Sequence, residues 1–208
     1  NGDGLAEIVV GASAANASSG HTYVIFGKSS TTPVQASNII NGTGGFVIFG
    51  TAPDDLSGLF VSRVGDMNGD GRADLIVGAP QNDAGGPNRG NSYVVFGKST
   101  TTSIVAANIL GSVGFQIRGE ADGDQSGFSA ASIGDVNGDG IQDAIVGAHL
   151  NDINGTSSGR AYVFYSPITP PASGTYLSRT GAGNPQNTPL GGLDNAGNPD
   201  SRVSVNYG

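Results

Sequence analysis

The loop at residues 66–74 carries the residue types in this chain that are best suited to bind an ion. Its sequence, DMNGDGRAD, places side-chain oxygens at loop positions 1, 3, 5 and 9, and a glycine at position 6. Hard cations such as Ca²⁺ are bound by several converging oxygens, and glycine permits the sharp turn that brings those oxygens together. The spacing therefore predicts a cation-binding loop.

The same pattern occurs three times. A second full loop, DVNGDGIQD, stands 69 residues later at 135–143, and a shortened copy, NGDGLAE, opens the chain at residues 1–7. Acidic, glycine-rich loops are often plain turns, but repetition of the oxygen pattern favours cation binding. An EF-hand is not expected, because that loop needs a bidentate Glu at position 12, where this chain has Val77 and Val146.

The ligand set of these loops contains only oxygen, which favours calcium over zinc or copper. Magnesium is the second choice, since it prefers a smaller octahedral cage and retains more water. Without an ion, the three carboxylates of each full loop would repel one another. We therefore expect a structural calcium that locks the hairpin between two strands.

Composition excludes several other classes of site. The net charge of −8, with only nine Lys and Arg residues, argues against nucleic-acid binding, which depends on neutralising phosphates. The absence of cysteine excludes disulfides and thiolate zinc sites. No apolar run approaches the roughly 20 residues that span a bilayer, so no membrane span is expected.

The loops lie within a longer internal repeat. Residues 45–83 and 114–152 align without a gap and are identical at 21 of 39 positions. No stretch shows helical periodicity, and four strands per repeat indicate an all-β fold, specifically a β-propeller. In the middle unit, the expected strands are 59–64, 74–79, 92–97 and 114–119.

These motifs resemble FG-GAP repeats, the blades of the integrin α-subunit propeller and of many bacterial surface proteins. The "GAP" element stands intact at residues 78–80 and is varied at 11–13 and 147–149, while the "FG" element is degenerate at 59–60 and 128–129. The resemblance covers roughly residues 1–166. It implies an incomplete propeller of four-stranded blades with about two and a half repeats.

The expected organisation has two parts. Residues 1–166 form the blades, and residues 167–208 form an irregular tail or linker rich in Gly, Pro and Asn. The repeat units are about 1–44, 45–113 and 114–166. Three blades cannot close a ring of the family's usual size, so we expect a piece of a longer chain. The alternative is self-assembly through open blade edges or through the tail, where residues 201–207 alternate like a strand that augments a neighbour's sheet.

The resemblance also assigns the metal ligands. In the second and third copies they are the side chains at positions 1, 3, 5 and 9 and the main-chain carbonyl at position 7: Asp66, Asn68, Asp70, Arg72 and Asp74, then Asp135, Asn137, Asp139, Ile141 and Asp143. In the first copy, which lacks position 1, the matching residues are Asn1, Asp3, Leu5 and Glu7. Whether this shortened copy binds metal stays open.

No pattern in the sequence supports catalysis, so an enzyme is not expected. Residues 155–159 fit G-x-S-x-G but align with a hairpin turn and not with the strand-to-helix elbow of hydrolases. The two histidines, His21 and His149, are expected to be structural or exposed. Four acids in the loops before the blades are interpreted as solvated turns, with a paired-carboxylate site as the alternative: Asp54, Asp55, Asp122 and Asp124.

The sequence and the resemblance together predict a calcium-stabilised extracellular module for protein interaction, adhesion or surface assembly. The expected location is outside the cell or on its surface, where calcium is abundant, and the expected partner is a protein or a glycan there. One alternative is a carbohydrate-binding propeller, although the lack of tryptophan weakens it. Another is an accessory domain of a larger secreted or surface enzyme.

Overall fold

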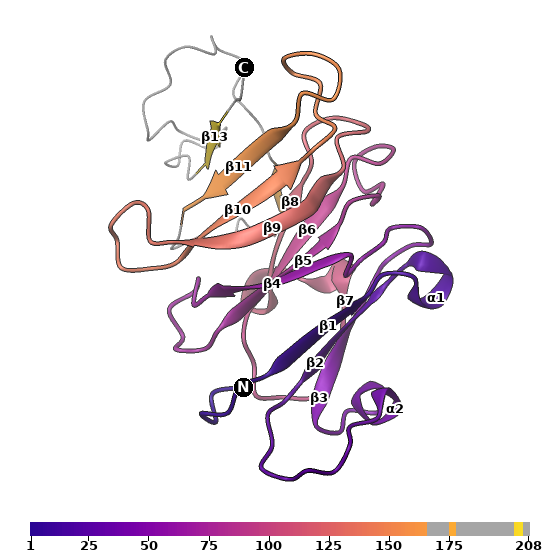
Figure 1. The fold of residues 1–208 in the computed structure, drawn as a ribbon, viewed down its shortest axis with the longest axis vertical. Coiled ribbons are helices and arrows are strands. Elements are labelled where there is room, and N and C mark those ends of the chain that lie inside the picture. The colour runs from indigo at the N-terminus through magenta and orange to yellow at the C-terminus, as the bar shows by residue number, and fades with distance from the viewer. Residues whose placement is uncertain (166–174, 178–201, 206–208) are drawn as a thin grey trace.

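Three β-sheets follow one another along the chain in the computed structural model, which describes residues 1–165, 175–177 and 202–205 (Figure 1). The first sheet has the strand order β1-β2-β3-β7. Its strands are β1 (Ile8–Ala12), β2 (His21–Ile25), β3 (Gly45–Phe49) and β7 (Ile104–Val105). The first three pair antiparallel, whereas β7 joins β3 in parallel from the next repeat.

The second sheet, in the order β12-β8-β6-β5-β4, contains the four strands expected in the middle unit. They are β4 (Phe60–Gly65), β5 (Asp74–Ala79), β6 (Asn91–Val95) and β8 (Gly114–Arg118), joined by the parallel strand β12 (Thr175–Leu177). The third sheet has the order β13-β11-β10-β9. It contains β9 (Ser126–Gly134), β10 (Asp143–Ala148), β11 (Arg160–Phe164) and β13 (Arg202–Val205). The predicted all-β, incomplete propeller-like fold is thus confirmed.

Most of the tail lies outside the described residues, but residues 202–205 of the segment considered as a donated strand are described. Within it, β13 pairs antiparallel with β11 of its own chain, and Val203 stands opposite Val163. In the second sheet, Phe115 of β8 stands opposite Val94 of β6 in the same way. β13 therefore occupies the fourth-strand position of the third sheet. The boundary near residue 166 stays a prediction.

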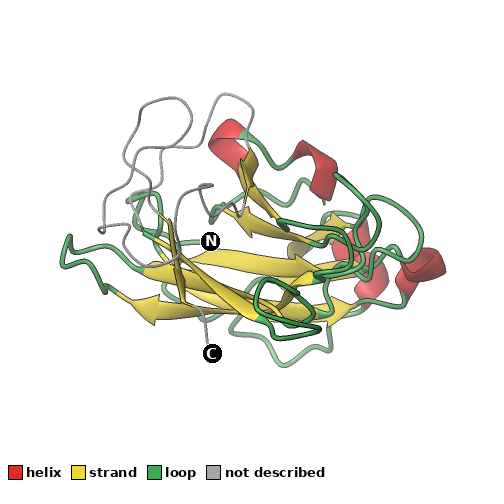
Figure 2. Cartoon of the chain, turned by 90° about the horizontal axis from the view of Figure 1, so that it is seen from above, coloured by secondary structure: helices red, strands yellow, loops and turns green. Residues whose placement is uncertain are grey.

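Short helices occupy connections between strands, and the sequence did not predict them. They are α1 (Ala15–Ser18), α2 (Ala36–Ile40) and two 3-10 turns, η1 (Ala106–Asn108) and η2 (Gly111–Val113). Figure 2 shows these short elements beside the strands that dominate the fold. Each is too short to display a helical period of 3.6 residues. No helix in the part of the chain that the structure describes is long and apolar enough to cross a membrane.

Two apolar clusters hold the sheets together. One joins the first and second sheets, where Val77 and Tyr93 pack with Phe46 and Ile48. The other joins the second and third sheets and contains fully buried side chains from β5, β8, β10 and β11. The apolar run of β5 contributes to both clusters because alternate side chains point to opposite faces of a strand.

Glycines allow neighbouring sheets to approach at the backbone. A Cβ atom on Gly78 would lie 2.0 Å from the carbonyl oxygen of Gly127, and one on Gly11 would lie 2.0 Å from that of Gly58. These distances are far below van der Waals contact, so each position requires glycine for close packing and not for backbone conformation. The two contacts recur at equivalent places, which gives both junctions the same geometry.

Candidate metal loops

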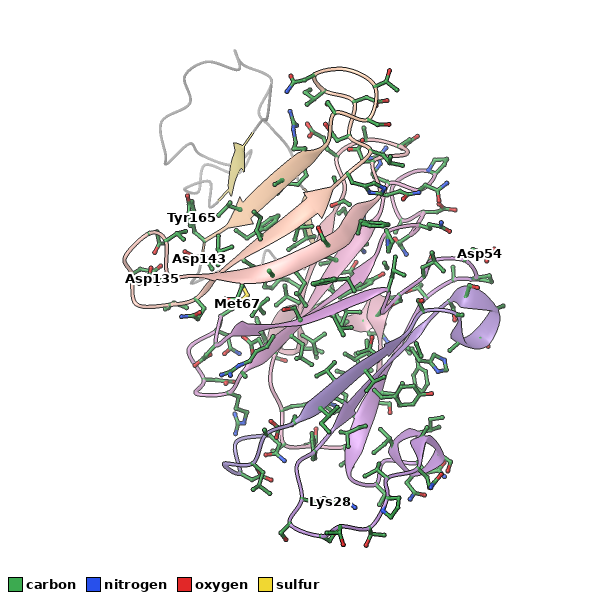
Figure 3. All side chains as sticks on the ribbon, viewed as in Figure 1. Lys28, Asp54, Met67, Asp135, Asp143 and Tyr165 are labelled. Atoms are coloured by element: carbon green, nitrogen blue, oxygen red, sulfur yellow. The ribbon has the colours of Figure 1, made fainter. Side chains whose placement is uncertain are left out.

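Each full acidic loop connects the first two antiparallel strands of a sheet. Residues 66–73 join β4 to β5, and residues 135–142 join β9 to β10. Gly69 and Gly71 have φ values of +74° and +84°, a backbone region that favours glycine. Figure 3 shows Asp135 and Asp143 on one such loop, whereas Asp54 lies at the other end of the strands. The metal loops and the loops that precede the sheets therefore occupy opposite ends.

In the loop at 66–74, the side chains at positions 1, 3 and 5 turn back onto the loop's own backbone. Asp66 accepts hydrogen bonds from the backbone N–H groups of Asp70 and Gly71, at 3.0 and 2.7 Å. The Oδ1 atom of Asn68 accepts from the N–H of Asp70 at 3.1 Å, and that of Asp70 accepts from the N–H of Arg72 at 2.8 Å. The sequence thus folds locally into a compact turn held by its acceptors.

The loop at 135–143 repeats this arrangement. Asp135 accepts from the backbone N–H groups of Asp139 and Gly140 at 3.1 and 2.8 Å, and Asn137 accepts from that of Asp139 at 3.0 Å. Asp139 accepts from the N–H of Ile141 at 2.8 Å. Hydrogen bonds from backbone N–H groups to Asp135 lower the pKa of its carboxyl group below the ordinary value. The bond from the N–H of Gly140 is the largest cause.

The shortened first copy keeps part of the pattern. Asn1 accepts a hydrogen bond from the backbone N–H of Asp3 at 2.8 Å, and Asp3 accepts from that of Leu5 at 2.9 Å, which lowers the pKa of Asp3. Glu7, at position 9, pairs with the N-terminal amine at 3.0 Å. Positions 3 and 5 are thus arranged as in the full copies.

The acid at position 9 differs from the others because it is buried. Asp74 is fully buried, and its two oxygens accept hydrogen bonds from the N–H groups of Met67 at 2.7 Å and Gly97 at 2.8 Å. Asp143 is also fully buried and accepts from the N–H of Val136 at 2.9 Å. The Gly97 bond fastens the loop to the end of β6, so Asp74 links the hairpin to the rest of its sheet.

Burial raises the pKa of Asp74 to about 6. Desolvation is the main cause, the negative charges of Asp66 and Asp70 act in the same direction, and the two backbone hydrogen bonds oppose it. A buried carboxylate beside two others is an environment in which a divalent cation would offset unfavourable charge. The donor set of the two full loops contains only oxygen, which is the kind of ligand that Ca²⁺ prefers.

The side chains are not gathered into a compact metal cluster. Across residues 1–165 and the two described tail strands, no three His, Cys, Asp or Glu side chains form a group that could hold an ion. Asp70 is instead close to Asn68 Nδ2 at 3.2 Å and to the guanidinium of Arg72 at 3.6 Å. The loops thus bring positions 1, 3 and 5 onto one turn and direct position 9 into the sheet.

The interpretation of all four loop acids before the blades as solvated turns was wrong for two of them. Asp55 and Asp124 are buried, and each accepts a hydrogen bond from a buried asparagine: Asn82 to Asp55 at 2.8 Å and Asn151 to Asp124 at 2.7 Å. Burial raises the pKa of both acids. Neither Asp55 nor Asp124 belongs to a paired-carboxylate site, because the hydrogen-bond partner of each is an asparagine amide.

These asparagines were missed as structural residues, although both aspartates and both asparagines recur at the 69-residue offset. In the second and third sheets, a buried Asp–Asn pair ties the loop that precedes the sheet to the hairpin between the second and third strands of that sheet. We name the two pairs the Asp–Asn clamps. Asp54 and Asp122 are exposed, as predicted.

The remaining catalytic candidates have structural surroundings. Residues 155–159 lie in the turn between β10 and β11, as the repeat alignment predicts. His21 Nδ1 lies 3.5 Å from the hydroxyl of Tyr23, and the exposed His149 stacks on Phe128 with ring centroids 4.0 Å apart. These contacts give the two histidines packing roles.

The fold and the loops together define a propeller-like repeat protein with an acidic hairpin in each full unit. The family model of the FG-GAP repeat matches residues 62–95 and 127–164. Each matched segment begins in the first strand of a sheet, crosses the acidic loop and ends in the third strand. The chain therefore contains two FG-GAP repeats, as the motifs predicted. No curated protein sequence matches it.

Proposed function

We propose that this chain is a calcium-stabilised, extracellular module for protein interaction, in which Ca²⁺ fastens the β4–β5 and β9–β10 hairpins. The observation that carries the proposal is the buried carboxylate at position 9 of both full loops, Asp74 and Asp143. Burying a charge costs free energy unless it is paired. A cation bound at the loop would offset that cost. Calcium outside cells is available to fill such a site.

The residues that would hold calcium are those of the two full loops, through side chains at positions 1, 3, 5 and 9 and the carbonyls of Arg72 and Ile141. When bound, Ca²⁺ supplies positive charge that relieves repulsion among the carboxylates. The role we propose for the ion is structural, because each full loop joins two neighbouring strands of one sheet. FG-GAP repeats occur in integrin-like propeller modules, which supports protein interaction as the function.

Thermal melting in calcium and in excess chelator tests this proposal. We expect calcium to raise the melting temperature, since an ion that binds only the folded state stabilises it. Asp139→Ala should reduce that rise by removing one ligand at an exposed position. Asp122→Ala, at an exposed acid far from the loops, is the matched control and should leave it unchanged. An identical melting temperature with calcium and with chelator would reject the structural calcium.

A second candidate, carbohydrate binding, is favoured by one cavity. Its volume of about 420 Å³ lies within the range of small-molecule sites. Among its lining residues are one acid, one lysine and several hydroxyl or amide groups: Asp70, Lys98, Thr100, Thr102, Ser103, Asn108 and Ser112. Phe96 and Val113 add apolar surface. Such a mixture suits the hydroxyls and the C–H face of a sugar.

Lys98 provides the test of this candidate. Its ammonium donates to the carbonyl oxygen of Thr102, lies 4.2 Å from the ring centroid of Phe46, and has a pKa lowered by burial. Lys28 donates to the Thr32 carbonyl in the same way but is exposed. A glycan array should identify a bound sugar. Lys98→Met should then weaken binding, while Lys28→Met should not. No bound glycan, or equal effects of both variants, would remove this candidate.

A further inference from the structure

Each full acidic loop contains an Asn–Gly dipeptide at positions 3 and 4, and such a dipeptide can react with itself. The backbone nitrogen that follows an asparagine is placed to attack the carbon of the asparagine's own side-chain amide. Glycine has no Cβ, so it leaves that nitrogen the least obstructed. The chain has five Asn–Gly dipeptides, which begin at residues 1, 41, 68, 137 and 154.

The reaction is a deamidation that consumes water and needs no enzyme. The glycine nitrogen loses its proton to solvent base and forms a bond to Cγ of the asparagine, while the bond from Cγ to Nδ2 breaks. Nδ2 takes a proton from water and leaves as ammonia, and the product is a cyclic succinimide. Water then opens the ring: breaking the bond from the nitrogen to Cγ gives aspartate, and breaking the bond to the main-chain carbonyl carbon gives isoaspartate. Nothing is oxidised or reduced.

The two loops hold their asparagine side chains in the same way. Asn68 accepts a hydrogen bond from the N–H of Asp70 at 3.1 Å and donates to the carboxylate of Asp70 at 3.2 Å. Asn137 makes the same two bonds with Asp139, at 3.0 and 2.9 Å. Both asparagines are exposed to water, and the glycines that follow them have φ values of +74° and +79°. The side-chain amides are therefore equally accessible and equally oriented.

The attacking nitrogens differ between the loops. The N–H of Gly138 donates to Oδ1 of Asp135 at 2.6 Å, a charge-assisted hydrogen bond that must break before the nitrogen can attack. Asp66, the equivalent acid, accepts from the N–H groups at positions 5 and 6 of its loop. Within the described part of the chain, the N–H of Gly69 makes no hydrogen bond, and a Cβ on Gly69 would meet nothing within 4 Å. The nitrogen of Gly69 is thus free to move onto its asparagine.

The other interior Asn–Gly dipeptides are held as well. The N–H of Gly42 donates to the carbonyl oxygen of Ile39 at 3.0 Å, and that of Gly155 donates to the carbonyl oxygen of Asp152 at 3.1 Å. The dipeptide at residues 1–2 is not a matched comparison, because its loop lacks the acid of position 1. Gly69 is therefore distinguished from the three interior glycines with which it can be compared.

We propose that Asn68–Gly69 is a site of spontaneous deamidation in the folded protein, and that Asp135 protects the equivalent Asn137. Aspartate at residue 68 adds a fourth carboxylate to the loop at 66–74, and isoaspartate adds a carbon atom to the main chain between positions 3 and 4. Either product changes one of the two acidic loops and leaves the other intact. The reaction does not depend on calcium, whereas its effect on calcium binding rests on the proposed function.

Peptide mass spectrometry of the protein incubated in mildly alkaline, calcium-free buffer tests the proposal. Each deamidated peptide gains the mass difference between an amide and an acid, and chromatography separates isoaspartate from aspartate. We expect Asn68 to react about tenfold faster than Asn137, because one hydrogen bond to a charged group corresponds to about that factor in rate. Incubation in guanidinium should abolish the difference, since neither glycine N–H is held in the unfolded chain.

Two substitutions separate the protecting hydrogen bond from other causes. Asp135→Ala should raise the rate at Asn137 towards that at Asn68, and the exposed Asp54→Ala is the matched control that should change neither rate. Circular dichroism checks that each variant is folded, and Asp135→Asn, with a weaker neutral acceptor, replaces Asp135→Ala if that variant is not. Equal rates at Asn68 and Asn137 in the folded protein would overturn the proposal. So would a faster reaction at Asn137, or a rate at Asn137 that the loss of the Asp135 carboxylate leaves unchanged.

Calcium titration of the protein before and after incubation keeps this proposal separate from the proposed function. A protein that deamidates at Asn68 but binds no calcium would support the modification site and reject the structural calcium. A protein that binds calcium but keeps Asn68 intact would reject the modification site alone.

Discussion

The buried Asp74 should give the calcium-free protein a stability that increases on acidification. Its pKa is raised from the ordinary 3.8 to about 6, with desolvation as the main cause. The folded state therefore binds this proton more tightly than the unfolded state. The stabilisation from protonation is fully present below the unfolded pKa of about 4 and is lost as the pH rises through about 6.

The size of the effect follows from the shift. Two pKa units correspond to about 3 kcal/mol, and screening by water at the adjacent exposed loop reduces this to about 1–2 kcal/mol. Burial raises the pKa of Asp55 and Asp124 as well, so their contributions have the same sign. Calcium should act in the opposite direction, because its carboxylate ligands must be ionised. Its stabilising effect should therefore be larger at about pH 7.5 than at about pH 5.

Urea unfolding followed by circular dichroism measures both trends, in calcium-free buffer and with saturating calcium. Asp74→Asn should flatten the pH dependence in calcium-free buffer, leaving only the part due to the clamp acids. Asp54→Asn, at an exposed acid, should not change it. If the calcium-free protein loses stability between about pH 7.5 and about pH 5, or if Asp74→Asn keeps the full dependence, the reasoning from burial is refuted.

Two further substitutions test the packing of the sheets. Asn82→Ala should destabilise the protein by about 2 kcal/mol in urea unfolding, because the buried carboxylate of Asp55 loses the hydrogen bond that Asn82 donates to it. A loss below about 0.5 kcal/mol would show that the clamp is dispensable. Gly78→Ala should cost about 3 kcal/mol, since its Cβ would meet the carbonyl of Gly127 at 2.0 Å. The equivalent Gly147→Ala should cost less than about 1 kcal/mol, and equal losses would contradict the close approach of the sheets.

The architecture could be predicted because the sequence repeats it. The alignment of 45–83 with 114–152 located the strands of the middle unit to within one or two residues, since the same apolar alternation and turn glycines occur twice. The acidic loops were placed between the correct strands for the same reason. What they bind stays a prediction.

The clamps could not be predicted from local pattern. Asp55 and Asn82 are 27 residues apart, and both lie among Gly, Pro and Asp residues that are typical of solvated turns. Only the packing of one loop over another decides that these polar side chains are buried. The short helix α2 was missed because five residues show no period, and β13 could not be assigned to its own chain because pairing partners are set by tertiary structure.

Calorimetric titration of the calcium-free protein with Ca²⁺ tests the central claim most directly. The two full loops predict two bound ions per chain. Asp66→Ala and Asp135→Ala should each remove one of them, and the double variant should remove both, while Asp54→Ala should keep both. An absence of binding, or binding that survives the double substitution, would contradict the account of the acidic loops as calcium sites.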